Sequence, residues 1–210
     1  ILWIATLLYR NYSPASMTDG MKIAAIGECM IEIRHRSDGD MTLAFGGDTS
    51  NTAVYFSRLA RNKEPRVDYL TALGDDPYSD QILKFWRDEG IGTDLVARLP
   101  GRLPGLYTIR TDPAGERSFY YWRSAAAARE MLRDENGVHL VKELASYNLI
   151  YLSGISLSIL TKADRTALLT ALEHAISAGV RVAFDPNYRP KGWPNRQVAA
   201  EIIDAMYRIC

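Results

Sequence analysis

Short apolar runs alternate along this chain with segments whose apolar residues have helical spacing. The run at 22–27 (KIAAIG), closed by a glycine, is typical of a buried strand. Similar runs predict further strands at 66–73, 148–152 and 180–184, and helical spacing or propensity predicts helices at 48–62, 77–89, 125–133, 162–178 and within 201–210. Because strands and helices alternate, the pattern predicts an α/β fold with a mostly parallel sheet.

Two other segments alternate with the period of two that is typical of β-strands. Residues 30–34 and 41–45 flank a polar turn at 37–40, and residues 106–111 and 116–123 flank a turn at 112–115. Each pair predicts a β-hairpin. Since hairpins are not helical crossovers, we expect them to form a second, small sheet that projects from the main one.

Several residues mark the expected ends of helices. Asp48 or Thr49 is predicted to cap the first helix, and Pro77 stands where the first residue of the second helix is expected. Gly90 and Gly179 are predicted to end two helices. The acidic pair at 75–76 precedes Pro77, so we interpret it as a solvated helix entry rather than as a site.

Composition narrows the class of protein. The chain has 210 residues, 47% of them apolar and 24% charged, which are ordinary values for a globular protein. Lys plus Arg and Asp plus Glu both total 25, so no basic excess favours nucleic acid as a partner. Two cysteines, Cys29 and Cys210, cannot form a disulfide framework, and a reducing, cytoplasmic setting fits them best. The three histidines have no metal-binding spacing.

The two ends differ from the rest of the chain. The apolar run at 1–8 is far shorter than the roughly 20 residues that span a bilayer, so we expect no membrane association. Residues 1–20 are expected to be a tail outside the fold. Residues 201–210 have helical spacing without a glycine or proline stop, so we expect the sequence to end inside a helix.

The first candidate for a ligand-binding segment is a double glycine that leads into a predicted helix. The segment 46–51 (GGDTSN) could let backbone approach a ligand closely and offer it free N–H groups; a tight turn with a helix cap is the alternative. No GxxxxGK[ST], GxGxxG or GxSxG motif is present, so none of these three binds a nucleotide or supplies a nucleophile here.

Aromatic residues and an arginine on the second hairpin form another candidate. Tyr107 could offer its hydroxyl to a polyol, although a strand tyrosine is often simply packed. Alternation places Phe119, Tyr121 and Arg123 on one face of their strand. A phenol and a guanidinium could therefore meet one ligand, and arginine suits a carboxylate; an exposed arginine at a strand end is the alternative.

The last candidate directly follows a predicted core strand. Ligands of open α/β sheets bind outside the carboxyl ends of the strands, which is where 185–189 (DPNYR) and 153–154 would lie. This placement favours a site at 185–189.

Together these segments resemble the ribokinase-like (PfkB) family of sugar kinases, from about residue 22 to residue 207. The matching segments are 27–32 (GECMIE), 45–49 (FGGDT), 69–75 (YLTALGD), 102–107 (RLPGLY), 115–117 (GER), 119–123 (FYYWR), 151–156 (YLSGIS) and 185–189 (DPNYR). The GGDxxN pattern is shared across the family. RLPGLY, GER with FYYWR, and SGIS point to its 2-keto-3-deoxygluconate kinase branch.

The resemblance implies a three-layer α/β/α fold with a mostly parallel central sheet, incomplete in this chain, and a small β-sheet lid. Residues 21–210 would be the N-terminal part of such a domain, with lid strands within about 28–45 and 94–123. The implied reaction is transfer of a phosphoryl group from ATP, with Mg²⁺, to the 6-hydroxyl of 2-keto-3-deoxygluconate, a small sugar acid. A cytoplasmic homodimer that pairs through the lid is also implied, and apolar Trp122 on the outer lid face fits that pairing.

The resemblance also assigns roles to residues. Sugar hydroxyls would be held by Gly46, Gly47, Asp48 and Asn51. Tyr107, Tyr121 and Arg123 would line the lid side of the sugar site. Arg189 would reach the acidic end of the sugar or the transferring phosphate, and Asn187 and Arg189 would lie at the junction with ATP. Two arginines would favour a sugar acid over neutral hexoses.

One family feature is missing from these residues. The family's GAGD segment, whose amides form an anion hole and whose Asp is the catalytic base, does not occur in the 210 residues. We therefore expect the chain alone to be inactive, with no catalytic residue of its own and one edge of its central sheet unpaired. Two alternatives stay open: another PfkB sugar kinase such as a fructokinase or ribokinase, and a non-catalytic module that binds a sugar acid.

Overall fold

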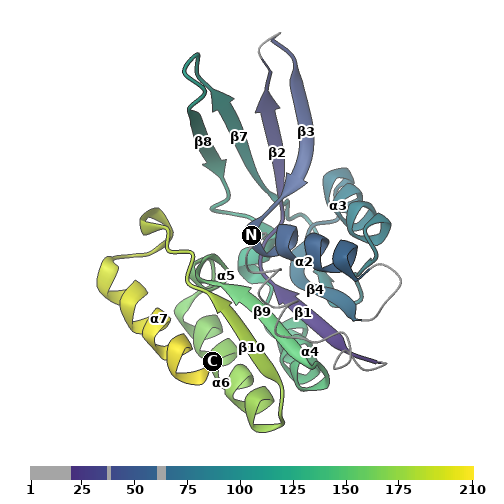
Figure 1. Cartoon of the computed structure of the whole chain (residues 1–210), viewed down its shortest axis with the longest axis vertical. Coiled ribbons are helices and arrows are strands. Elements are labelled where there is room, and N and C mark those ends of the chain that lie inside the picture. The colour runs from purple at the N-terminus through teal and green to yellow at the C-terminus, as the bar shows by residue number, and fades with distance from the viewer. Residues whose placement is uncertain (1–19, 37–38, 61–64) are drawn as a thin grey trace.

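The computed structural model describes residues 20–36, 39–60 and 65–210, so the predicted tail lies almost wholly outside the described residues. The central sheet has the strand order β10-β9-β1-β4-β5, with β6 also paired to β4, and every pair is parallel. Its strands are β1 (Lys22–Ile26), β4 (Arg66–Leu73), β5 (Ile91–Gly92), β6 (Val96–Arg98), β9 (Leu149–Ser153) and β10 (Arg181–Asp185). Figure 1 shows helices on both sides of this sheet.

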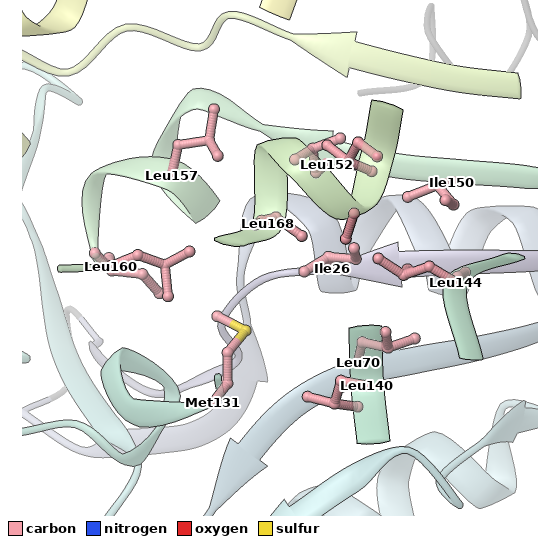
Figure 2. Close-up of a cluster of buried hydrophobic side chains, with 14 of the residues drawn as sticks. Ile26, Leu70, Met131, Leu140, Leu144, Ile150, Leu152, Leu157, Leu160 and Leu168 are labelled. Atoms are coloured by element: carbon pink, nitrogen blue, oxygen red, sulfur yellow. The ribbon is translucent and has the colours of Figure 1, made fainter. Parts of the chain in front are cut away.

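Strand β1 lies in the middle of the sheet and is buried on both faces, as its unbroken apolar run predicts. Ile23 and Ala25 belong to one hydrophobic core, which also contains side chains of α2 and α3. Ala24 and Ile26 belong to the other core, which contains side chains of α4, α5, α6 and α7. Figure 2 shows Ile26 within this second core. Successive residues of one strand thus hold three layers together.

The helices follow the predicted alternation with the strands. They are α2 (Asp48–Leu59), α3 (Pro77–Asp88), α4 (Asp134–Glu143), α5 (Gly154–Ser158), α6 (Lys162–Ser177) and α7 (Arg196–Ile209), with three-residue or four-residue 3₁₀ turns η1 (Ala127–Glu130), η2 (Leu144–Ser146) and η3 (Pro190–Gly192). Pro77 is the first residue of α3, as predicted, and Asp76 caps that helix by accepting from Tyr78 and Ser79 N–H groups. The interpretation of this acidic residue as a helix entry is confirmed.

The two hairpins form a separate four-stranded sheet that projects from the main body, as predicted (Figure 1). The order of this small sheet is β3-β2-β7-β8, and its strands are β2 (Met30–His35), β3 (Met41–Gly46), β7 (Gly105–Thr111) and β8 (Arg117–Trp122). The lid strands of the second hairpin were expected within 94–123. Strand β6 lies in this range, but it pairs with β4 in the central sheet and is not part of the small sheet.

One helix prediction is wrong and one helix was missed. The predicted helix at 125–133 is only the 3₁₀ turn η1, because Ala127 donates its N–H to Leu103 O and the small alanines pack into the core beside β4. Tertiary packing thus outweighs the helix propensity of alanine. Helix α4 was not predicted. The helix predicted within 201–210 is confirmed as part of α7, which begins earlier, at Arg196. Of the residues expected in the first helix, 61–62 lie outside the described residues.

Within the described part of the chain, every helix is too short or too polar to cross a bilayer.

Candidate functional site

The connections at the carboxyl end of the central sheet meet closely, as expected for parallel strands. Ser156, in the first turn after β9, donates its hydroxyl to Ile26 O at the end of β1 over 2.6 Å. Gly154 passes so close to Pro186 O, after β10, that a Cβ there would overlap that oxygen. The segments after β1, β9 and β10 therefore form one packed edge, which is the position where ligands of open α/β sheets bind.

Helix α2 begins at this edge, and its double glycine is explained by close packing. Gly47 is the residue that caps α2, so the prediction that the side chain of Asp48 or Thr49 caps it is wrong. A Cβ on Gly47 would overlap the carbonyl oxygen of Glu28, and a Cβ on Gly46 would lie 2.8 Å from the Tyr107 hydroxyl. The two glycines thus let the start of α2 pass against the β1–β2 connection and the small sheet. The alternative of a tight turn with a helix cap is met in part, because Gly47 itself is the N-cap, without a side-chain hydrogen bond.

Buried polar side chains hold this end of α2 in place. The hydroxyls of Thr49 and Tyr69 are 2.7 Å apart, which ties α2 to β4. The indole N–H of Trp86 in α3 donates to Ser50 Oγ over 3.0 Å. Buried hydrogen bonds of this kind fix a side chain because breaking them leaves a polar group without water. The first turn of α2, which carries Asp48, is therefore a rigid platform.

Asp48 and Asn187 meet at the site although they are 139 residues apart in the sequence. Asn187 Nδ2 donates to Asp48 Oδ2 over 2.9 Å. Asn187 has a φ of 28°, a region that asparagine tolerates better than most residues, and its N–H donates to Asp185 Oδ1 over 3.0 Å. The turn after β10 thus places the amide of Asn187 beside the carboxylate of Asp48 in α2. Both groups can form hydrogen bonds with sugar hydroxyls.

Tyr107 and Tyr121 share one face of the small sheet, here called its inner face. Their ring centroids are 5.7 Å apart, and Tyr107 is buried with Met30 and Ile109, whereas Tyr121 is 53% exposed. The Tyr107 hydroxyl donates to Glu32 Oε2. Burial and then the Glu32 carboxylate raise the pKa of Tyr107, so its hydroxyl stays protonated. The ring of Tyr107 is thus packed, and its hydroxyl is held in a fixed orientation by Glu32. Both interpretations of this residue, packing and a hydroxyl offered to a ligand, are compatible with this arrangement.

Arg123 follows β8 and reaches the β1–β2 connection. Its Nη2 forms an ion pair with Glu28 Oε2, and its side chain is 23% exposed while that of Glu28 is 2% exposed. Burial raises the pKa of Glu28 to about 7, although Arg123 acts in the opposite direction. Gly105 makes room for this pair, since a Cβ there would lie 2.6 Å from Glu28 Oε1. The predicted arginine is therefore at the base of the small sheet and partly open to solvent.

The structure brings most of the predicted residues together but leaves one apart. A Cβ on Gly46 would lie within 4 Å of both Tyr107 and Asn51, which places the small sheet next to α2. Arg189, in contrast, is exposed and donates to the carbonyl of its neighbour Tyr188 over 3.2 Å. Among the described residues, no hydrogen bond or ion pair joins its side chain to the other predicted site residues. Its role therefore stays a prediction.

Two carboxylates were missed as site residues. Glu28 follows a core strand directly, so the rule that singled out Asp185 could have found it. Glu32 stands opposite Tyr107 in the parallel pairing of β2 with β7, and its partner could be named only once that pairing was known. Both lie in segment 27–32, which carries part of the family resemblance.

The assembled groups suit an anionic polyol. Asp48, Asn187 and Tyr107 offer oxygen and nitrogen atoms for hydroxyls, and Arg123 offers a cation. Among the residues that the structure describes, no group of three His, Cys, Asp or Glu side chains could hold a metal ion.

Comparisons with known proteins agree with this arrangement. The chain is 49% identical to the 2-dehydro-3-deoxygluconokinase of Dickeya dadantii (strain 3937) over 184 residues, which are 88% of this chain and 59% of that protein. It is 45% identical to the enzyme of the same name from Escherichia coli (strain K12), over 88% of this chain and 60% of that protein. The chain thus spans about 60% of the length of these curated relatives.

The fold is shared with solved structures. The structure of fructokinase with bound ATP from Xylella fastidiosa superposes with a TM-score of 0.74 at 24% identity, over 90% of this chain and 56% of that one. The three-layer fold with a small second sheet, expected from the resemblance, is confirmed. Residues 21–210 match the description "pfkB family carbohydrate kinase", and with the identities above this shows that the chain belongs to the pfkB family of carbohydrate kinases.

Proposed function

We propose that this chain supplies the sugar-acid site of a kinase that transfers a phosphoryl group from ATP to the 6-hydroxyl of 2-keto-3-deoxygluconate. The observation that carries the proposal is Arg123, a partly exposed cation at the base of the small sheet on the same side as Tyr107 and Tyr121. A carboxylate partner distinguishes a sugar acid from a neutral hexose. The names of the relatives from Dickeya dadantii and Escherichia coli support the same substrate.

The proposed roles follow the positions of the groups. Asp48 and Asn51, with backbone at the glycine pair 46–47, hold sugar hydroxyls. Tyr121 and Arg123 cover the sugar from the small sheet, which acts as a lid, and Tyr107 orients its hydroxyl toward the same space. Asn187 and Arg189 lie on the side where ATP, with magnesium as its counter-ion, delivers the phosphoryl group. ATP is abundant in the cytoplasm, where we expect the reaction.

Catalysis by phosphoryl transfer depends on positioning and on stabilising charge, with a base that accepts the hydroxyl proton. The 210 residues contain no GAGD segment, which the family resemblance identifies as the source of the base and the anion hole. We therefore expect this chain to bind the sugar acid without phosphorylating it, and to become active when those groups are supplied.

A chimera tests this expectation. Residues 21–210 would be joined to the part of the Escherichia coli relative that this chain does not match, and ADP release would be measured with ATP, magnesium and 2-keto-3-deoxygluconate. We expect turnover by the chimera and none by the 210-residue chain, which should still show a thermal shift with the sugar acid in the absence of ATP. Equal use of fructose by the chimera would make the substrate assignment wrong. Turnover by the chain alone would place the base within these residues.

Variants of the chimera sharpen the assignment of Arg123. Arg123→Met should raise KM for 2-keto-3-deoxygluconate roughly 10-fold to 100-fold, because a hydrogen bond between charged groups contributes about 1.5–3 kcal/mol. Arg87→Met removes an exposed arginine from α3, outside the small sheet, and should leave KM near its original value.

We also propose that two copies pair through the outer face of the small sheet. Strand register aligns Leu43, Ile33, Thr108 and Tyr120 in one row and Phe45, Ile31, Leu106 and Trp122 in the next. Leu43 is 47% exposed and Trp122 61% exposed, so this face presents apolar side chains to solvent.

A matched pair of substitutions tests the dimer by light scattering. Leu43→Lys should convert the dimer to a monomer, because it places a charge in the proposed interface. Leu59→Lys, at a site of similar exposure (49%) near the end of α2, should leave the dimer intact. A monomer in the unmodified chain, or dissociation in both variants, would contradict pairing through this face.

A further inference from the structure

Glu28 is a buried carboxylate enclosed by several elements. It lies in the β1–β2 connection, where burial has the largest influence on its pKa, followed by Arg123 after β8, Arg129 of η1 and Asp48 of α2. Tyr69 of β4 and the adjacent Cys29 are the other titratable groups that interact with it. Strand β7 contributes Gly105, which has no side chain and packs against Oε1. Two cations and one anion therefore surround a carboxylate that is almost completely removed from water.

The bonding of this carboxylate is incomplete. Apart from Arg123, no described residue donates a hydrogen bond to either oxygen of Glu28. Its direct polar contact is the ion pair between Glu28 Oε2 and Arg123 Nη2. A buried carboxylate needs a charge partner and hydrogen bonds to stay ionised at low cost, and among the described residues Arg123 alone supplies them to Glu28. Its charged form therefore depends on Arg123.

Arg123 is also the cation that the proposed function assigns to the ligand. Its Nη2 is buried against Glu28, whereas the side chain as a whole is 23% exposed. A ligand carboxylate at the exposed part of the guanidinium would share this cation with Glu28. Two carboxylates that share one site favour protonation of one of them. The buried carboxylate, which has the poorer solvation, is the one that would take the proton.

We propose that Glu28 is the internal counter-ion of Arg123, and that it takes up a proton from solvent when the carboxylate of a sugar acid binds Arg123. This inference rests on the proposed function and deepens it, because it names a specificity-determining residue for the acidic end of the ligand. In the free site Glu28 balances the charge of Arg123. In the bound site the ligand balances it, and Glu28 becomes a neutral acid.

Affinity for the sugar acid then depends on pH in a defined direction. Burial already raises the pKa of Glu28 to about 7, and a second anion nearby raises it further. Binding should therefore strengthen as pH falls from 8.5 to 6, by up to about tenfold for each unit by which the ligand raises the pKa of Glu28.

Isothermal titration of the 210-residue chain with 2-keto-3-deoxygluconate measures the proton directly. Titrations at pH 7.5 in buffers of different ionisation enthalpy should show uptake of part of a proton per ligand. The uncharged methyl ester of the same sugar acid should show none. Glu28→Gln and Glu28→Met should bind the acid without proton uptake and with an affinity that is nearly constant between pH 6 and pH 8.5.

A second arginine pair gives a matched control. Glu89 contacts Arg58 at the far end of α2, so Glu89→Gln should leave the proton uptake unchanged. Binding by the unmodified chain without proton uptake, or uptake that persists in both Glu28 variants, would overturn the inference and leave the proposed function standing. Absence of binding by any sugar acid at any pH would overturn the proposed function and this inference with it.

Discussion

A Gly47→Ala variant is expected to lose at least about 3 kcal/mol of unfolding free energy and its ability to bind a sugar acid. The added Cβ would lie well inside 3.0 Å of the Glu28 carbonyl oxygen, a separation that Cβ atoms essentially never show. The oxygen is a backbone atom and the position of the Cβ is fixed by the backbone of residue 47, so no side-chain rotation can relieve the overlap. Either the start of α2 or the β1–β2 connection must shift, and both carry residues of the site.

The loss comes from packing and not from backbone conformation. Gly47 has a φ of 178°, which is extended backbone that any residue adopts. Protein interiors are packed densely enough that one inserted methyl group forces its neighbours to move. Urea denaturation, followed by circular dichroism, measures the change in unfolding free energy, and titration with 2-keto-3-deoxygluconate measures the loss of binding.

Gly192→Ala is the matched control for this substitution. Its Cβ would lie 3.0 Å from Ser158 Oγ, which is the end of a side chain that can rotate. We expect a change below about 1 kcal/mol. A Gly47→Ala variant as stable as the Gly192→Ala variant would show that the β1–β2 connection yields to α2 more easily than its packing implies.

The fold could be predicted where the local sequence pattern and the tertiary environment favour the same secondary structure. The run at 22–27 is apolar at every position from Ile23 to Ile26, which fits only a strand covered on both faces. The alternation in β7 and β8 likewise indicates a sheet with two unlike faces, and the register of the hairpin follows from its short turn.

Prediction failed where contacts between distant segments decide the local structure. The alanines at 125–128 favour a helix by propensity, yet Leu103 O accepts the N–H of Ala127 and draws the segment against the core. The start of α2 has two good capping residues, Asp48 and Thr49, and neither caps it. Asp48 instead accepts from Asn187, and Thr49 pairs with Tyr69.

In the candidate site, too, positions within one element could be predicted and contacts between distant segments could not. The strand-end rule located 185–189, and alternation placed Tyr121 and Arg123 on one face, because both follow from element geometry. The pairs that shape the site could not be predicted, since Asp48 with Asn187 and Glu28 with Arg123 join segments far apart in the sequence. Only the folded chain shows that Arg123 already has a buried anionic partner.

Glu28 is that partner, and removal of its charge is the second change with a large expected effect. The Glu28→Gln variant should become more stable than the unmodified chain as pH rises. Burial raises the pKa of Glu28 from 4.5 to about 7. An acid whose pKa is higher in the folded state binds more protons when folded, so its contribution to the unfolding free energy decreases as pH rises from about 4.5 to 7 and stays low above 7. Glu28→Gln removes this dependence.

The expected size follows from the same shift in pKa. Relative to the unmodified chain, Glu28→Gln should gain roughly 2.5 kcal/mol of unfolding free energy between pH 5 and pH 8, because each pKa unit corresponds to about 1.36 kcal/mol. Arg123 Nη2 is buried, so loss of its partner lowers the unfolding free energy, but by the same amount at every pH, and it does not enter the difference between pH 5 and pH 8. Denaturation of both proteins at each pH gives the difference, in which the titration of all other groups cancels.

Glu28→Met is the control for Glu28→Gln, because it also removes the charge but does not introduce the polar amide of glutamine. Both variants are neutral at every pH, so both should show the same gain between pH 5 and pH 8, whatever their stability at pH 5. A difference that stays constant with pH would mean that Glu28 ionises in the folded chain as readily as in water. Arg123 would then compensate the buried charge completely, and the carboxylate would have no reason to take up a proton when a ligand competes for that arginine.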